Sequence, residues 1–146
     1  MKTSYKSNMN LIIGALFILT TLSFGAAERP NDFTHFRMFI HNAIEENISL
    51  HVYKRGGDDY GRATLGFNEE FNWKYGVGIG TQVVGEFWWG EKYTHISVYN
   101  GDVFALCFNA KILSTQHCYW KVQSDGFWIS QYNRTGPKYW NHWHDW

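Results

Sequence analysis

The chain has 146 residues, a length that suits a single domain, and its 13 Lys and Arg balance 13 Asp and Glu, so the formal net charge is zero. No run of basic residues is present, and we therefore expect no nucleic-acid partner that is held through the phosphate backbone. Aromatic residues make up 19% of the chain. Because aromatic side chains bury large areas and favour pleated surfaces, this composition favours a small β domain.

Residues 1–27 have the layout of a secretory signal peptide. Lys2 and Lys6 precede an apolar run from Leu11 to Leu22, and small residues follow as far as Ala27. The apolar run has about 12 residues, fewer than the roughly 20 that a spanning helix needs. We predict cleavage after Ala27 rather than stable membrane insertion. Residues 28–146 would then form a single secreted, extracellular domain.

Two strands are predicted after this leader. The stretch FRMFIHN, Phe36 to Asn42, is rich in β-forming residues and ends at a polar pair. In NISLHVYK, Asn47 to Lys54, apolar and polar residues alternate with a period of two, which is typical of a half-buried strand.

A glycine-rich break, RGGDD, follows directly from Arg55 to Asp59. Gly56 and Gly57 tolerate positive φ and aspartates hydrogen-bond within turns, so the break predicts a connection between strands. The alternative is a catalytic pair, Asp58 and Asp59. Two carboxylates act as acid and base when they face each other across a substrate, whereas adjacent residues point in different directions. We therefore interpret these residues as a turn or a recognition loop.

Three further strands are predicted in the middle of the chain. Aromatic residues alternate with polar ones from Phe71 to Tyr75, and the glycines that follow lack the Gly-Lys-Ser/Thr ending of a phosphate loop. TQVVGEFWW, Thr81 to Trp89, reads as a core strand in which Gly85 marks a bulge or a close approach. THISVYN, Thr94 to Asn100, alternates again and stops at the turn dipeptide Asn100-Gly101.

The last third of the chain is partly ambiguous. Phe104 to Cys118 is compatible with a short helix or turn and also with a strand. CYWKVQSDGFWISQYN then predicts a hairpin with its turn at residues 124–126. The tail GPKYWNHWHDW either clasps the domain as an edge strand or stays loose. Many short strands without a long helix describe an all-β fold, a small β-sandwich of short antiparallel strands.

Candidate chemistry is sparse. His142, His144 and Asp145 could hold a transition metal, but further ligands are lacking nearby, and the alternative is a tail that packs on the domain. No Gly-x-Ser-x-Gly elbow is present. Cys107 and Cys118 are expected to pair in an oxidising compartment, the alternative being two buried free thiols. We expect no catalytic residue, no cofactor and no metal.

Two surface features remain. The sequons at Asn47 and Asn133 are candidate N-glycosylation sites. Surplus tryptophans permit a carbohydrate-binding face, because aromatic rings stack on sugars. These tryptophans are Trp88, Trp89, Trp128, Trp140, Trp143 and Trp146.

The order of these features resembles the plant self-incompatibility protein family, the S-protein homologues. The resemblance is carried by FIHN, HVYKRGGDDYG, FNWKY, TQVVGEFWW and CYWKVQSDGFW, which together span about residues 36–130. Where the family has its first two cysteines, this chain has Val52 and Gly85. If the two missing cysteines were partners, Cys107 and Cys118 keep the remaining bridge, whereas a crossed pairing would leave both without their partners.

The resemblance implies a β-sandwich ligand outside the cell, with no catalytic residues and no cofactor. Founding members of the family act as pistil determinants recognised by pollen. Specificity in such a ligand would lie in loops, so the candidate contacts to a cell-surface receptor protein are Arg55, Gly56, Gly57, Asp58, Asp59, Tyr60, Glu91 and Lys92. A lectin-like binder is the second interpretation and an extracellular hydrolase the third. The oligomeric state stays open.

Overall fold

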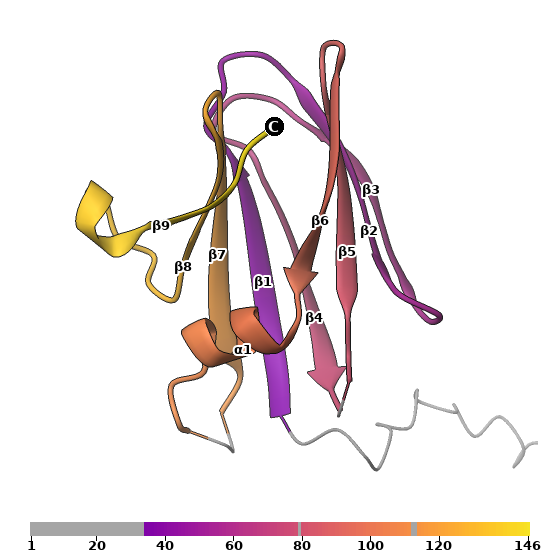
Figure 1. Ribbon diagram of the computed structural model, residues 1–146, viewed down its shortest axis with the longest axis vertical. Helices are drawn as coiled ribbons and strands as arrows, with labels where there is room; N and C mark the ends of the chain where they lie inside the picture. Colours follow the sequence, from indigo (N-terminus) through magenta and orange to yellow (C-terminus); the bar gives the residue numbers. More distant parts are fainter. Residues whose placement is uncertain (1–33, 79, 112–113) are drawn as a thin grey trace, which may run out of the picture.

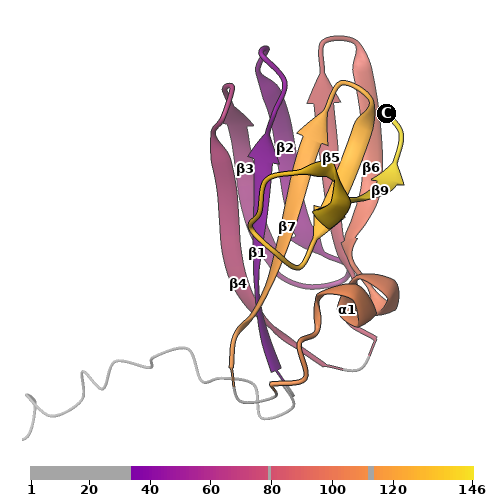
Figure 2. The ribbon, with the colours of Figure 1, turned by 90° about the vertical axis from the view of Figure 1, so that its left-hand side faces the viewer.

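The computed structural model describes residues 34–78, 80–111 and 114–146. The predicted signal peptide and its cleavage site lie outside these residues. Two β-sheets face each other as the layers of a sandwich (Figure 1), and the turned view looks onto the broad face of the sheet that contains β1 and β7 (Figure 2). One sheet has the strand order β4-β1-β7-β8-β9 and the other β3-β2-β5-β6. The predicted all-β sandwich is confirmed.

The strands are short, and within the described residues one α-helix and one 3-10 helix lie among them. Neighbouring strands run antiparallel, except that β1 and β7 pair in parallel among the described strands. A parallel pair needs a long connection, and here strands β2 to β6 and helix α1 lie between the two partners in the sequence. The elements are β1 (Thr34–Asn42), β2 (Ile48–Lys54), β3 (Asp59–Leu65), β4 (Glu70–Val77), β5 (Val83–Trp89), β6 (Lys92–Tyr99), α1 (Gly101–Cys107), β7 (Gln116–Gln123), β8 (Gly126–Ser130), η1 (Pro137–Tyr139) and β9 (Asn141–His144).

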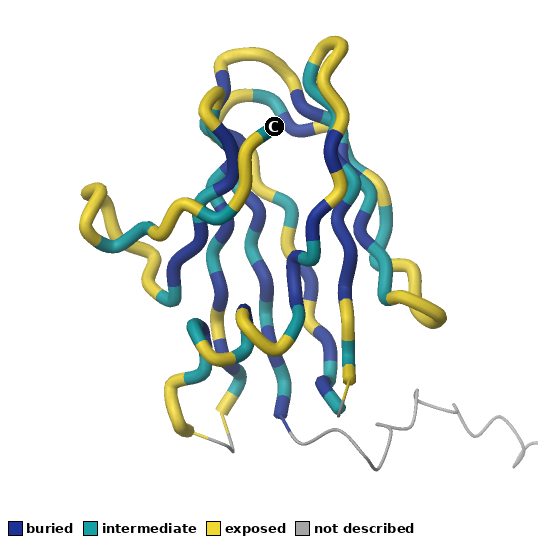
Figure 3. Tube along the Cα trace, in the orientation of Figure 1, coloured by how far each residue is buried: buried dark blue, intermediate teal, exposed yellow. Residues whose placement is uncertain are grey.

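The core lies between the two sheets and follows from the alternation of side chains. In β2 the predicted alternation is confirmed, because Ile48, Leu50 and Val52 are at most 1% exposed while the residues between them are partly exposed. Figure 3 shows buried residues along the middles of the strands and exposed residues at the connections. Across the core, Phe87 of β5 meets Phe127 of β8 with 4.8 Å between the ring centroids.

The predicted loop is too long at its end. Asp59 and Tyr60 were expected to belong to the loop, but they are the first two residues of strand β3. It pairs with β2 at the edge of the four-stranded sheet, and Leu65 is its one fully buried residue. An edge strand with so little burial carries no apolar alternation, which is why its sequence gives no strand signal.

The turn predicted at Asn100-Gly101 is instead the start of helix α1. The Asn100 side chain accepts hydrogen bonds from the backbone N–H groups of Asp102 (3.1 Å) and Val103 (3.0 Å), so it caps a helix. The ambiguous stretch from Phe104 to Cys118 therefore starts helical and ends in β7.

The predicted late hairpin is confirmed, and the tail clasps the sandwich. Trp120 pairs with Ile129 and Val122 with Phe127 across β7 and β8. Strand β9 then pairs with β8 as an edge strand. Of the two alternatives for the tail, the clasp is therefore observed.

Cys107 and Cys118 form a disulfide that joins α1 to β7, so the alternative of two free thiols is wrong. Val52 lies directly opposite Gly85 on the neighbouring strand. The two positions at which the resemblance implies other cysteines are thus neighbours on adjacent strands. No helix among the described residues is long and apolar enough to cross a membrane.

Candidate functional site

The two predicted recognition loops lie at opposite ends of one sheet. The first is the turn between β2 and β3, which contains Arg55, Gly56, Gly57 and Asp58. The second is the turn at Gly90 and Glu91 between β5 and β6, while Lys92 already belongs to β6 and pairs with Trp89. Strand β5 has seven residues and runs from one end to the other, so the turns are about 20 Å apart (Figure 1). They do not form one loop cluster.

The surface that joins the two turns is the outer face, by which we mean the side of the four-stranded sheet turned away from the core. Four side chains form a row across its strands, because Arg62 pairs with His51, His51 with Glu86, and Glu86 with His95. A neighbouring row contains Thr64, Ser49, Trp88 and Tyr93. The outer face is therefore lined by polar, charged and aromatic side chains.

His51 is the most enclosed member of the charged row, with 11% of its side chain exposed. Its Nδ1 lies 3.3 Å from Glu86 Oε2, and its Nε2 lies 3.1 Å from the Asp59 carboxylate. Tyr93 Oη donates a further, longer hydrogen bond of 3.4 Å to Glu86 Oε1. These contacts hold one imidazole and two carboxylates in fixed positions on the sheet.

The two adjacent aspartates differ in their surroundings. The Gly61 backbone N–H donates to Asp59 Oδ1 over 2.9 Å, and this bond, followed by the contact with His51, lowers the pKa of the Asp59 carboxyl. Asp58 is an exposed residue of the turn before β3. Of the two, only Asp58 lies in the predicted turn, whereas Asp59 is the first residue of β3.

This arrangement is suited to recognition rather than to proton transfer. A general base needs a nitrogen that is available to the substrate, whereas both ring nitrogens of His51 face carboxylates. The charged row instead presents hydrogen-bonding groups that are already oriented by their neighbours. Beside it, an open hollow of about 480 Å³ is lined by Ser49, Arg62, Thr64 and Trp88 among others.

The six candidate tryptophans are all partly buried and none is fully exposed. Trp88 packs against Tyr93 (5.3 Å between centroids), and Trp146 packs against Trp89 (5.5 Å). The remaining three also have partners: Trp128 with His142, Trp140 with Lys121, and Trp143 with Trp120. The exposed large apolar residues are instead Phe67, Tyr93 and Tyr132.

The histidines of the tail do not gather metal ligands. His142 Nε2 lies 3.3 Å from Asp145 Oδ1, and His144 Nδ1 contacts the Asp145 backbone oxygen. Within the described part of the chain, no group of three or more His, Cys, Asp or Glu side chains could hold a metal ion. Both sequon asparagines, Asn47 and Asn133, are exposed.

Four residues of the outer face, Arg62, Glu86, Tyr93 and His95, were not among the predicted contacts. The alternation in THISVYN places Thr94, Ile96 and Val98 toward the core, and all three are buried. The same alternation assigns Tyr93 and His95 to the opposite face. The sequence thus contains a signal for these two residues, but the pairing of His95 with Glu86 depends on strand register.

Residues 37–146 match the family model described as Plant self-incompatibility protein S1. The match begins within β1 and continues through β9 to the end of the chain. No curated protein matches the chain.

Proposed function

The chain belongs to the plant self-incompatibility protein S1 family, and we propose that it is secreted and acts as a recognition ligand for a protein on the surface of another cell. The family consists of recognition proteins and is not known for enzymatic activity. The predicted leader in residues 1–27 and the disulfide, which suits an oxidising compartment, support secretion. Exposed sequons at Asn47 and Asn133 would be accessible to glycosylation in the same pathway.

We place the partner on the outer face. The observation that carries this assignment is Tyr93, which is 51% exposed and packs on Trp88 beside the charged row. Tyr, Trp and Arg are the residue types that most often dominate binding energy at protein interfaces, and here they project from paired strands rather than from a loose segment.

The size of a protein interface explains how two distant turns contribute to one contact. Four strands about 4.8 Å apart and about 20 Å long present a projected area of about 400 Å². A stable interface removes about 800 Å² of accessible surface from each partner. A partner seated on the outer face would therefore extend over both predicted turns, with Arg55 and Asp58 at one end and Glu91 and Lys92 at the other.

Carbohydrate is the second candidate partner, and one observation favours it. The rings of Trp88 and Tyr93 lie side by side on the outer face, where a sugar ring could stack on them. Both candidates use the same surface, so the experiment must distinguish a protein from a glycan.

The function is tested by adding the tagged, secreted protein to a panel of intact plant protoplasts and measuring bound tag against concentration. The expected result is saturable binding to at least one cell type, abolished when the cells are first treated with trypsin and unchanged by glycosidases or free sugars. Binding that glycosidases abolish would favour the lectin. Absence of saturable binding on every cell type would contradict a cell-surface ligand.

The contribution of the turns is measured with two double variants, Arg55→Ala with Asp58→Ala, and Glu91→Ala with Lys92→Ala. Each pair lies at one end of the outer face, so each is expected to weaken binding, and the two effects should add because the sites are far apart. If neither variant changes binding, the partner does not reach the turns.

A further inference from the structure

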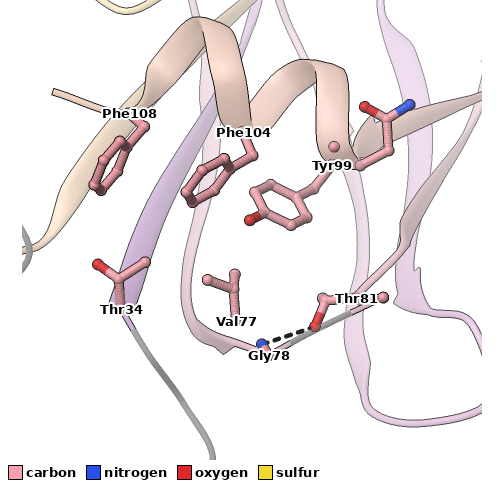
Figure 4. A pocket seen from close by; sticks show the side chains of 10 residues that line it. Thr34, Val77, Gly78, Thr81, Tyr99, Phe104 and Phe108 are labelled. Atoms are coloured by element: carbon pink, nitrogen blue, oxygen red, sulfur yellow. Dashed lines mark hydrogen bonds between the residues drawn. The ribbon is translucent and has the colours of Figure 1, made fainter. Parts of the chain in front are cut away.

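A separate cavity of about 580 Å³ lies at the end of the sandwich where α1 packs. Its walls come from α1 and from the nearby ends of β1, β4 and β6 (Figure 4). Four side chains point into it, namely Phe104 of α1, Phe108 at the C-terminal cap of α1, Tyr99 of β6 and Val77 of β4. This volume is within the range of small-molecule sites in proteins.

The aromatic wall of the cavity is held in place from behind. Phe104 and Phe108 are one helical turn apart and stack with 4.8 Å between centroids. Tyr99 packs edge-on against Phe36 and against Tyr75, at 5.2 Å in each case, and both of these residues belong to the buried core. The capped start of α1 fixes the helix that carries the phenylalanines. The cavity is therefore part of the folded framework rather than a gap between loose side chains.

The side chains that line the cavity disfavour a charged ligand. None of the described side chains that line the cavity is ionised at neutral pH. A charged ligand would lose its hydration there without gaining a counter-charge, which is costly. An uncharged, largely apolar molecule would instead exchange water for contact with aromatic rings.

The wall contains a hydroxyl that can bond to a ligand. The Tyr99 hydroxyl points into the cavity and has no hydrogen bond to the other described residues drawn in Figure 4, whereas the Thr81 hydroxyl accepts from the Gly78 N–H over 3.0 Å. Burial raises the pKa of the Tyr99 phenol, so the group stays protonated and is a hydrogen-bond donor at physiological pH.

We propose that this cavity binds a small, uncharged and mainly apolar molecule that offers one oxygen acceptor to the Tyr99 hydroxyl. The cavity lies away from the outer face, and neither Tyr93 nor the charged row lines it. The proposal therefore stands independently of the cell-surface partner.

Charge selection is tested with two fluorescent probes that share one skeleton. N-phenyl-naphthylamine is uncharged, and anilinonaphthalene sulfonate is the same molecule with an added sulfonate. The full secreted protein is titrated with each probe. We expect saturable binding of the uncharged probe at one site per chain, and binding of the sulfonate that is about tenfold weaker or undetectable.

The position of the site is tested with a filling variant. Gly101 lines the cavity at the start of α1, and a Cβ atom there would meet no other atom within 4 Å. The backbone therefore admits a side chain at this position, and we expect the leucine of Gly101→Leu to occupy part of the cavity. We expect this variant to weaken binding of the uncharged probe by about tenfold. Gly57→Leu is the matched control, because Gly57 does not line the cavity and its nearest neighbour is the flexible Lys54 side chain.

The hydrogen bond is tested with prodan, an uncharged naphthalene dye that carries a carbonyl group. Tyr99→Phe removes the donor and keeps the ring, so prodan binding should weaken by about fivefold while binding of N-phenyl-naphthylamine is unchanged. The proposal is overturned if neither uncharged probe binds saturably. Equal binding of the sulfonate, or equal binding by the Gly101→Leu and Gly57→Leu variants, would likewise overturn it.

Discussion

Gly85 is the residue whose lack of a side chain most clearly shapes the core. A Cβ atom at this position would lie 2.6 Å from a ring carbon of Phe87 and 2.8 Å from a methyl group of Val98, and both of these side chains are buried. Phe87 thus occupies the space that a side chain at position 85 would take. A larger residue at position 85 must displace the core.

We therefore predict that Gly85→Ala lowers the free energy of unfolding by about 1–3 kcal/mol through overpacking. Gly57→Ala is the control, because the nearest atom to its Cβ belongs to the flexible Lys54 side chain at 3.3 Å. Urea denaturation of both variants measures the difference. Equal stability of the two variants would show that Phe87 has room to move.

Asp59 gives a prediction about pH. Its folded pKa lies below the ordinary value of 3.8, first because of the Gly61 N–H and then because of His51. A lowered folded pKa contributes stability above pH 3.8, and this contribution is lost as the pH falls through the folded pKa. Asp59→Asn should therefore be less stable than the wild type at pH 7, and the gap should close in more acidic solution.

Chemical denaturation at pH 7 and at the lowest pH at which both proteins still fold measures that gap. Asp58→Asn is the matched control, since it removes the neighbouring exposed carboxylate, which lies in the turn before β3. A gap for Asp59→Asn that is constant with pH would mean that the lost interaction does not depend on the charge.

Among the elements, the tail is the one whose role the sequence leaves undecided. Trp146 packs against Trp89 of one sheet and Phe127 of the other, and its Nε1 donates to the Gln123 backbone oxygen over 2.7 Å. Next to it, Gly126 has φ +133°, and a Cβ atom there would overlap the His144 backbone oxygen, so the close approach of the tail requires this glycine.

Trp146→Ala should lower the free energy of unfolding by about 2 kcal/mol, because it removes contacts with both sheets and one hydrogen bond. His144→Ala, an exposed neighbour on β9, serves as the control and should have a smaller effect. Thermal unfolding followed by near-ultraviolet circular dichroism reports both. A Trp146→Ala protein as stable as the control would mean that the tail rests on the sandwich without stabilising it.

How far the sequence predicts an element depends on how strongly that element is buried on one face. Strand β2 is predicted because its alternate residues are core residues, and the late hairpin because a short turn fixes its register. Strand β3 is missed because only Leu65 is buried, and the start of α1 is missed because Asn100-Gly101 serves equally as a turn or as a helix start. At both places the local sequence is compatible with two different structures, and tertiary packing decides between them.

At the scale of the whole molecule, the family and the sandwich follow from the sequence, whereas the candidate site follows only in part. The two predicted loops were correctly placed at connections, with Asp59, Tyr60 and Lys92 in the adjoining strands. Their separation by the length of β5 and the contacts of His51 with Glu86 depend on which strands become neighbours. No local pattern contains that information. The strand order gives the protein two independent surfaces, the outer face and the cavity under α1.

The claim that the outer face is the recognition surface is tested most directly by comparing two exposed tyrosines on opposite sheets. Tyr93 is 51% exposed on the outer face, and Tyr132 is 46% exposed after β8 of the other sheet. The measurement is the dissociation constant of the wild type, Tyr93→Ala and Tyr132→Ala for the protoplasts that bind the protein, with circular dichroism to show that all three fold. We predict binding that is about tenfold weaker for Tyr93→Ala and unchanged for Tyr132→Ala. Unchanged binding by Tyr93→Ala together with weakened binding by Tyr132→Ala would contradict the account and place the partner on the five-stranded sheet.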